Sequence, residues 1–528
     1  MSIVATQYFR DILFTMSIHR LLTSIFLSVL TFCLVPAPAS AVTDFATSFK
    51  STYTISDSNQ VEVSHQIAIT NLTPHLYLTS YSVATSGENI AYITASDESG
   101  PLSTKTITQG GITSIQLDIT RATIGLNKVK QIHLNYTTHN LVEVIGDTKT
   151  INIPRLDKAN EAVSYQRIVK IKNVSALKSY IFPEPTSIST DDLYTTYTFD
   201  SHENDALTLL FGDSATYQLT LTYDLKNSEL SSITSELALP PDTSYQKIQI
   251  ESLSPPPKTL VLDQDGNLMA RYTLPPQSKL QVQAVLYVTV KPIPDFIDPS
   301  TSKVEPPKKP KYVQTDSSVV SNLAQRLKTP LNIYNYIVDN FTYNYDIAVK
   351  SSRVGSIQAL TSPSNVRSTE FTDSFIALLR TNDHSVREII GIGYKDQAVN
   401  TFHSWPEFYD QSMHTWIAVD PTRCHTTGGI NYFDKLDYTH ITFVRHGHEE
   451  EYPLPPSQYV STVVTQYSLA EPVFIQKDNV VENTGKVGVF HDKAGYIPPY
   501  SSKTIQTSSA TSLYDKIKQI CAKLLSIF

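Results

Sequence analysis

Apolar and polar residues alternate through residues 42–226, a region also rich in Thr, Ser and Tyr. Stretches such as QVEVSHQIAIT (Gln60–Thr70) and YQLTLTYDL (Tyr217–Leu225) repeat with a period of two, which is typical of strands with one buried face. Turn residues separate these stretches. The pattern predicts an all-β sandwich region at 42–226, built as one large domain or two small ones.

A second β segment follows at 227–292, where Asp265-Gly266 has the composition of a hairpin turn. This segment predicts a second β-sandwich domain. Residues 293–313 are rich in Pro and Lys, a composition that favours an extended, stiff linker.

The hydrophobic period changes after the linker. Apolar residues at helical spacing predict helices over 319–327, after Thr329-Pro330 and over Phe371–Arg380. Three strands are then expected, at Arg387–Tyr394, His403–Tyr409 and His414–Asp420. Helices followed by a sheet indicate an α+β domain at 314–450, and the Pro-rich, sparsely patterned residues 451–512 predict an irregular extension.

Both ends of the chain carry targeting or amphipathic patterns. Residues 16–41 combine a basic start, an apolar run and the small residues Ala39-Ser40-Ala41, so residues 1–41 are expected to be a signal peptide cleaved before Val42. The alternative is an uncleaved anchor. Residues 513–528 predict an amphipathic helix, which either lies on a membrane surface or packs on its own protein. We expect a secreted, extracellular or cell-surface protein.

Composition narrows the classes of partner. Of 528 residues, 41% are hydrophobic, enough for sizeable cores, and the formal charge of −8 provides no basic field for nucleic acid. Three cysteines are present, and Cys33 lies in the expected signal peptide. The remaining two, Cys424 and Cys521, are too few for a disulfide framework, so stability must come from packed cores.

Candidate chemistry is concentrated in the α+β region. Ser368 lies where a helix is predicted to begin, which suits either a helix N-cap or a nucleophile stabilised by free amides and the helix dipole. His403 opens one predicted strand and Asp420 ends another. A nucleophile, an imidazole that takes its proton and a carboxylate that orients the imidazole are the parts that acyl transfer needs.

The order of these parts resembles the transglutaminase-like superfamily, which has a papain-like cysteine-protease fold. The family pattern is Cys-x-(Asp/Glu)-(Phe/Tyr) opening a helix, then Gly-Ile-Pro-Ala-Arg, His-x-Trp-x-Glu, and Trp followed by Asp-Pro-Thr. The matching residues here are Ser368-Thr369-Glu370-Phe371, Ser385-Val386-Arg387, His403-Ser404-Trp405-Pro406-Glu407, and Trp416 through Asp420-Pro421-Thr422. The upstream sandwiches look like those of secreted bacterial members.

The resemblance implies a catalytic set of Ser368, His403 and Asp420 in which serine replaces the family's cysteine. A thiol ionises readily beside an imidazole, whereas a hydroxyl must lose its proton during attack. We therefore expect a weak or inactive enzyme that binds or presents a protein or peptide ligand, such as a cell-wall component, at the cell surface. The alternative is an active acyltransferase, peptidase or amidase using the Ser368-His403-Asp420 triad.

Two other features carry residue types with candidate chemistry. Cys424, four residues after Asp420, is a candidate relocated thiol nucleophile, although a loop after a strand supplies no helix amides. His446-Gly447-His448, followed by Glu449, Glu450 and Glu451, has some metal-ligating residue types, but this spacing is more typical of a solvated surface. We expect no metal or cofactor.

Overall fold

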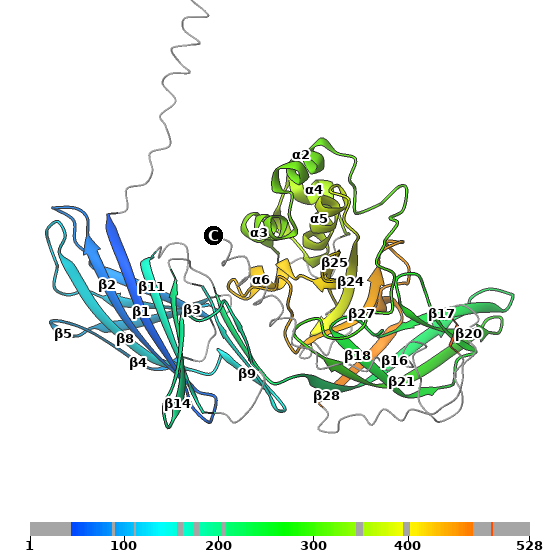
Figure 1. Cartoon of the computed structure of the whole chain (residues 1–528), viewed down its shortest axis with the longest axis horizontal. Coiled ribbons are helices and arrows are strands. Elements are labelled where there is room, and N and C mark those ends of the chain that lie inside the picture. Colours follow the sequence, from blue (N-terminus) through cyan, green and yellow to red (C-terminus); the bar gives the residue numbers. More distant parts are fainter. Residues whose placement is uncertain are drawn as a thin grey trace, which may run out of the picture.

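The computed structural model of the chain describes residues 44–86, 90–109, 112–155, 162–173, 179–201, 206–344, 352–393, 402–467 and 487–488. It is a multidomain protein with two β-sandwich regions and an α+β unit, so the predicted fold class is confirmed. Figure 1 shows the first sandwich at the left, the second at the lower right, and the helices above the second. The expected signal peptide and C-terminal helix lie outside the described residues.

The first sandwich packs a broad sheet against smaller ones. Alternating residues of its strands, including Ile67, Leu134 and Leu117, are fully buried in a shared core. The sheets, in strand order, are β13 (Ser187–Thr190), β14 (Tyr194–Ser201), β11 (Ala162–Lys172), β1 (Phe45–Ile55), β2 (Val61–Asn71), β8 (Val129–Thr138), β4 (Ile90–Asp97), β5 (Gly100–Pro101); β3 (Ser80–Ser86), β7 (Ile112–Asp118), β6 (Ser103–Gln109); and β12 (Ser179–Phe182), β15 (Leu207–Phe211), β10 (Thr148–Ile153), β9 (Val142–Ile145).

The second sandwich is larger than the sequence predicts. One sheet contains β18 (Gln246–Ser254), β21 (Lys279–Val290), β16 (Ala215–Lys226), β28 (Val460–Tyr467), and the other contains β17 (Ile233–Leu239), β20 (Leu268–Leu274), β19 (Thr259–Leu262), β29 (Val487–Gly488). The turn at Asp265-Gly266 joins β19 to β20, as expected.

Two expected boundaries therefore change. Strand β16 was placed in the first region, yet it pairs along its whole length with β21 and forms the centre of the second sandwich. Residues 451–467 were expected to be irregular, yet they contain a short 3-10 helix, Pro456–Gln458, and strand β28. Strand β28 pairs with β16, so the chain returns to the second sandwich after completing the α+β unit.

The segment at 293–313 has no helix or strand, in agreement with its Pro-rich composition. It is nevertheless packed against the α+β unit, whereas its composition predicted an extended, stiff linker. Val304 and Val313 are buried, and Glu450 accepts hydrogen bonds from the backbone amides of Tyr312 (3.1 Å) and Val313 (2.7 Å). These contacts fix the start of the α+β unit.

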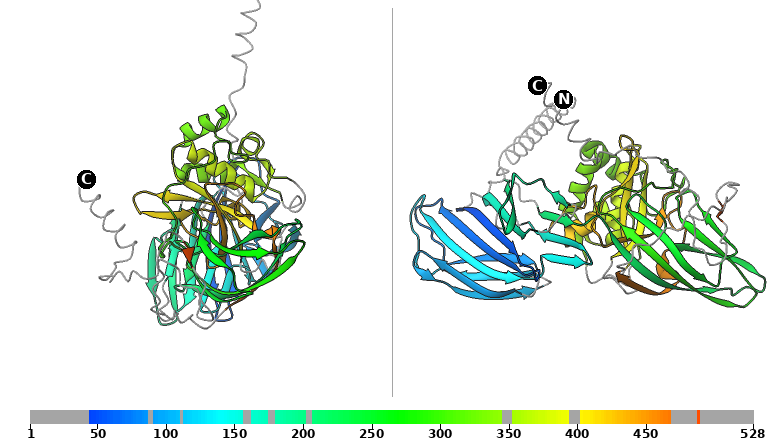
Figure 2. Two further views of the ribbon diagram at one scale, coloured as in Figure 1. Left: turned by 90° about the vertical axis from the view of Figure 1, so that its right-hand side faces the viewer. Right: turned by 60° about the horizontal axis from the view of Figure 1, so that its bottom comes forward.

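The α+β unit packs helices on one side of an antiparallel sheet. The sheet order is β26 (Thr415–Ala418), β25 (His403–Asp410), β24 (Val386–Gly393), β27 (His440–His446). The remaining elements are α2 (Ser318–Leu327), α3 (Pro330–Asn340), β22 (Thr342–Tyr343), α4 (Ser356–Thr361), β23 (Ser364–Val366), α5 (Ser368–Arg380) and α6 (Pro421–Thr426). The second view of Figure 2 shows the second sandwich against the side of this unit opposite the helices.

Local sequence explains where the helices begin. Ser317 caps α2 by accepting from the amide of Val319, and Thr329 caps α3 by accepting from Asn332, with Pro330 at the first helical position. The predicted helices at these positions are confirmed. Within the described part of the chain, no helix is both long and apolar enough to cross a membrane.

Two cores hold the α+β unit in place. The central helix α5 is buried along most of its length, with Phe371, Phe375 and Leu378 in a core shared with α3 and the sheet. On the other side of the sheet, Ile441 and Phe443 of β27 enter the core of the second sandwich. Strand β27 therefore couples the two domains through continuous apolar packing.

Candidate active site

Ser368 is the first residue of α5, and it does not cap the helix. The N-cap is Arg367, and Glu370 accepts the Arg367 backbone amide at 3.0 Å. The interpretation of Ser368 as the N-cap is therefore wrong, because α5 begins at Ser368 itself and Arg367 takes the N-cap position. The half-buried Ser368 hydroxyl instead accepts a hydrogen bond from the backbone amide of Ser404 at 3.4 Å.

His403 and Asp420 form a direct pair. His403 is the first residue of β25, and Asp420 ends the neighbouring β26 segment and caps α6, with its Oδ1 accepting the amide of Arg423 at 2.8 Å. The second carboxylate oxygen, Oδ2, lies 2.6 Å from Nε2 of His403. Asp420 is fully buried, whereas the His403 side chain keeps 14% of its surface exposed. The carboxylate thus fixes the ring from inside the protein.

The charge of Asp420 is strongly favoured. Burial alone would raise the pKa of this carboxyl, but the charges and hydrogen bonds of His403 and His440 outweigh burial and hold the pKa well below its ordinary value. Asp420 is therefore ionised across the physiological range. An ionised carboxylate on Nε2 leaves Nδ1 as the ring nitrogen available to a reacting group.

The three candidate residues converge on the start of α5. Ser368 contacts the amide of Ser404, the residue that follows His403 on β25, so the hydroxyl and the imidazole lie on neighbouring segments. Among the described residues, however, no hydrogen bond joins the Ser368 hydroxyl to the His403 ring. The structure brings His403 and Asp420, the candidate base and its carboxylate, into bonding contact and leaves Ser368, the candidate nucleophile, without a hydrogen bond to the imidazole.

The buried Trp405 side chain packs against the His403 ring. It is 1% exposed and stacks on the imidazole with a centroid distance of 5.8 Å and an interplanar angle of 30°. Gly391 on β24 makes room for the indole, since an added Cβ there would lie 2.3 Å from a Trp405 ring carbon. The tryptophan of the His-x-Trp motif therefore restricts the orientation of the imidazole.

Sequence reasoning missed His440 and Asp437. The second oxygen of Asp420, Oδ2, also lies 3.3 Å from Nε2 of His440, and Nδ1 of His440 lies 2.8 Å from Asp437. The run HITFVRH, now strand β27, is rich in β-branched and aromatic residues and could have predicted a further strand beginning at His440. No local pattern indicates that this strand places His440 beside Asp420, the N-cap residue of α6, which is twenty residues earlier in the chain.

The α+β unit also matches a known family. Residues 314–421 match the family model of the transglutaminase-like superfamily. This region is a transglutaminase-like domain. No curated protein matches the chain.

Solved structures resemble parts of the chain. A candidate cysteine protease from Cytophaga hutchinsonii aligns at 16% identity with a TM-score of 0.32, over 54% of this chain and 96% of that protein. An M1 zinc metallopeptidase from Deinococcus radiodurans aligns at 8% identity with a TM-score of 0.23, over 36% of this chain and 46% of that protein.

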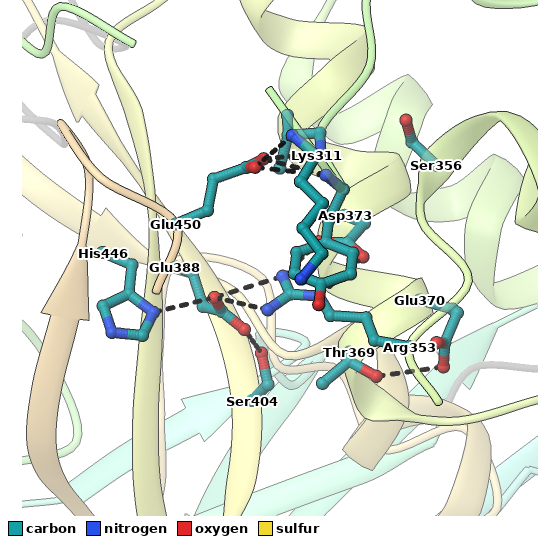
Figure 3. Close-up of polar contacts among 12 residues, drawn as sticks. Lys311, Arg353, Ser356, Thr369, Glu370, Asp373, Glu388, Ser404, His446 and Glu450 are labelled. Carbon is teal, nitrogen blue, oxygen red and sulfur yellow. Dashed lines mark hydrogen bonds and ion pairs between the residues drawn. The ribbon is translucent and has the colours of Figure 1, made fainter. Parts of the chain in front are cut away.

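A buried charge network within the transglutaminase-like domain joins Arg353, Asp373 and Glu388 (Figure 3). Glu388 accepts a hydrogen bond from the Ser404 hydroxyl at 2.6 Å and pairs with Arg353 at 3.1 Å. Arg353 also pairs with Asp373 on α5 through Nε at 2.9 Å. Although burial alone would raise it, the Arg353 charge holds the pKa of Glu388 at about 2. This network ties α5 to β24 and β25, the elements that carry Ser368 and His403.

The motif's arginine and glutamate are structural. Arg387 on β24 lies directly across from Glu407 on β25 and pairs with it at 2.9 Å, with both side chains almost completely buried. Arg387 also stacks on Trp416, with its guanidinium carbon 3.8 Å from the ring centroid. These motif residues hold the sheet together and lie away from the Ser368 hydroxyl's contacts.

Neither alternative cluster gains support from the structure. Cys424 lies 5% exposed in the core beside α3, and burial raises the pKa of its thiol to about 11, which disfavours the thiolate that a nucleophile needs. His446 and His448 bind different carboxylates: Nδ1 of His446 lies 3.2 Å from Glu388, and Nδ1 of His448 lies 2.7 Å from Asp265. Among the described residues, no group of three or more His, Cys, Asp or Glu side chains is placed to hold a metal ion.

Proposed function

We propose that this protein is exported and that its transglutaminase-like domain binds a protein or peptide ligand while turning over acyl substrates weakly. The observation that carries the proposal is the environment of Ser368. Its hydroxyl stands at the first position of α5 and accepts from the Ser404 amide, without a hydrogen bond to the imidazole that would have to remove its proton.

The chemistry of oxygen explains why this arrangement is weak. A thiol at this position would transfer its proton to His403 before attack, and the thiolate would then act at longer range. A hydroxyl needs a base already in hydrogen-bond contact, because its proton leaves during attack. The His403–Asp420 pair, with its 2.6 Å contact, is therefore assembled without a competent attacking atom.

The exposure of Ser368 and His403 and the net charge of the chain favour a peptide ligand. Ser368 and His403 are partly exposed, whereas Asp420 and Trp405, which contact His403, are buried. An extended peptide can therefore approach Ser368 and His403 from solvent. The net charge of −8 disfavours nucleic acid. A protein or peptide, including a cell-wall peptide, is the ligand class that we propose.

Introducing a thiol tests the proposal. With Ser368→Cys, we expect hydrolysis or amine exchange of glutamine-containing peptides to rise at least about tenfold over the wild-type chain, since the imidazole and carboxylate are already placed. The double variant Ser368→Cys/His403→Gln is the matched control and should return to the wild-type rate. Brisk turnover by the wild-type chain would overturn the proposal of weak catalysis.

The alternative is a working serine triad, and the intact His403–Asp420 pair is the observation that favours it. A fluorophosphonate probe distinguishes the two functions. Weak catalysis predicts no labelling of Ser368 beyond that of the Ser368→Ala variant. Labelling that disappears in Ser368→Ala and in His403→Gln would instead establish a serine nucleophile.

Export is proposed from the leader-like residues 16–41. We expect the mature protein isolated from its producing cell to begin at Val42, which N-terminal sequencing checks directly. Replacing both Ala39 and Ala41 with Arg should block this cleavage, because the processing site needs small residues. A mature chain that retains residues 16–41 would show an anchored protein.

A further inference from the structure

His440 is placed to change how the His403–Asp420 pair works. The buried imidazole lies between two carboxylates: Nε2 is 3.3 Å from Oδ2 of Asp420, and Nδ1 is 2.8 Å from Oδ1 of Asp437. We propose that His440 is a cationic positioning residue that shares the Asp420 carboxylate with His403 and thereby keeps the His403 imidazole in its neutral, proton-accepting form. This inference deepens the proposed function and rests on its assignment of His403 as the base.

The hydrogen bonds of His440 require two ring protons. Carboxylates only accept, so each nitrogen that faces one must donate, and only an imidazolium donates from both nitrogens. Burial alone would lower the pKa of His440, but the charges and hydrogen bonds of Asp437 and Asp420 raise it to about 9. His440 therefore carries a positive charge at neutral pH.

Asp437 is held in place for this contact. Its Oδ1 accepts from the backbone amide and hydroxyl of Thr439 at 2.7 and 2.6 Å, and its Oδ2 accepts from the Tyr432 hydroxyl at 3.1 Å. The other groups that face His440 are the rings of Trp405 and Tyr432, at centroid distances of 5.3 and 5.6 Å. The protonation state of His440 is thus determined by two carboxylates, Asp437 and Asp420, and by His403, which shares Asp420 with it. The Tyr432 phenol is neutral.

The net charge of the group formed by Asp420, Asp437 and His440 affects the protonation of His403. With His440 cationic and both carboxylates ionised, the buried group carries one net negative charge while His403 is neutral. Without the His440 cation it would carry two, and the second charge would draw a proton onto His403. Because His403 and His440 bind the same oxygen of Asp420, the cation acts at close range.

The consequence differs for sulfur and oxygen nucleophiles. A thiol–imidazole ion pair requires the proton to move from sulfur to His403 and to stay there, which a second cation on Asp420 disfavours. A general base for a hydroxyl must instead begin neutral. His440 therefore makes this ion pair less favourable than it would be with a neutral residue at position 440, without preventing it.

The thiol introduced by Ser368→Cys reports this effect directly. Its alkylation by iodoacetamide forms a C–S bond and releases iodide, and the rate follows the thiolate fraction as pH changes. We expect Ser368→Cys/His440→Gln to show a pH midpoint lower by about 1 unit than Ser368→Cys alone. Glutamine is chosen because its amide can still donate to Asp420. Peptide mapping separates this thiol from Cys424 and Cys521.

Two controls define the result. Ser368→Cys/His414→Gln, which changes an exposed histidine at the end of the β25–β26 hairpin, should leave the midpoint unchanged. Ser368→Cys/His403→Gln should raise the midpoint, because no imidazole then accepts the proton. If His440→Gln raises the midpoint or leaves it unchanged, His440 has a structural role only and the inference is overturned.

A measurement on the unmutated chain keeps the inference testable if His440→Gln does not fold. Nitrogen NMR of histidine-labelled protein should show His440 with protons on both ring nitrogens at about pH 7.5. A neutral His440 ring at this pH would overturn the inference. Failure of the proposed function would appear separately, as brisk substrate turnover by the wild-type chain.

Discussion

Replacing Arg387 with Met is expected to destabilise the transglutaminase-like domain by about 3–5 kcal/mol. The Arg387 guanidinium is completely buried and pairs with Glu407 at 2.9 Å and with Asp298 at 2.8 Å. It also donates to the Ser300 hydroxyl at 2.6 Å. Removing the cation leaves two buried carboxylates without their nearest guanidinium, a cost that exceeds the lost packing.

The effect extends across the domain boundary because Asp298 and Ser300 belong to the 293–313 segment. Arg445 of β27 reaches the same place, donating to the carbonyl oxygens of Asp265 and Gly266 at 3.1 Å and lying 3.4 Å from Asp298. The two arginines thus join this segment and the β19–β20 turn to the sheet that carries His403. Loss of Arg387 should also release the segment at Asp298, which faster proteolysis near residue 298 would reveal.

Tryptophan fluorescence measures this prediction in the relevant domain alone. The only two tryptophans of the chain, Trp405 and Trp416, are both buried in this sheet. Denaturant unfolding followed through them should give a much lower midpoint for Arg387→Met. The matched control is Arg271→Met, which breaks a partly exposed pair with Glu236 on the second sandwich and should cost less than about 1 kcal/mol. Equal losses in both variants would contradict the prediction.

The sequence predicts those features of the fold that depend on residues close together in the chain. Helix caps at Ser317 and Thr329 and the alternation within strands are set by neighbouring residues, so these elements are correct. The partners of strands are set by distant residues. Strand β16 reads as half-buried from its own alternation, but nothing in it indicates pairing with β21 and with β28, which is more than two hundred residues away.

The candidate site shows the same division. Motif spacing places His403 and Asp420 correctly next to one another, because the turn between β25 and β26 brings the two strands together. Ser368 is found by the same motif, but its interpretation as an N-cap is wrong, because α5 begins at Ser368 itself and Arg367 takes the N-cap position. His440 escaped notice because it reaches Asp420 only through the placement of β27 beside β24, a long-range pairing.

The pH dependence of stability provides the second large effect, and it follows from His440. The folded-state pKa of His440 is about 9, compared with about 6.5 for an unperturbed histidine. A raised pKa means that the stabilisation is fully present below the unfolded value, about 6.5, and is lost as the pH rises through about 9. Asp420 acts in the opposite direction: its lowered pKa gives stabilisation that is lost only as the pH falls below the ordinary carboxyl range.

We therefore expect the domain to lose on the order of 3 kcal/mol of unfolding free energy between about pH 6 and pH 9.5. The measurement is denaturant unfolding followed by tryptophan fluorescence at several pH values. His440→Gln should lower stability at pH 6 and flatten the curve, since the group that releases the proton is gone, while His414→Gln should keep the wild-type slope. A wild-type curve that is already flat over this range would mean that His440 gains no proton on folding. One of its two carboxyl groups would then have to carry a proton and donate it to the bare ring nitrogen, because a neutral imidazole donates from only one nitrogen.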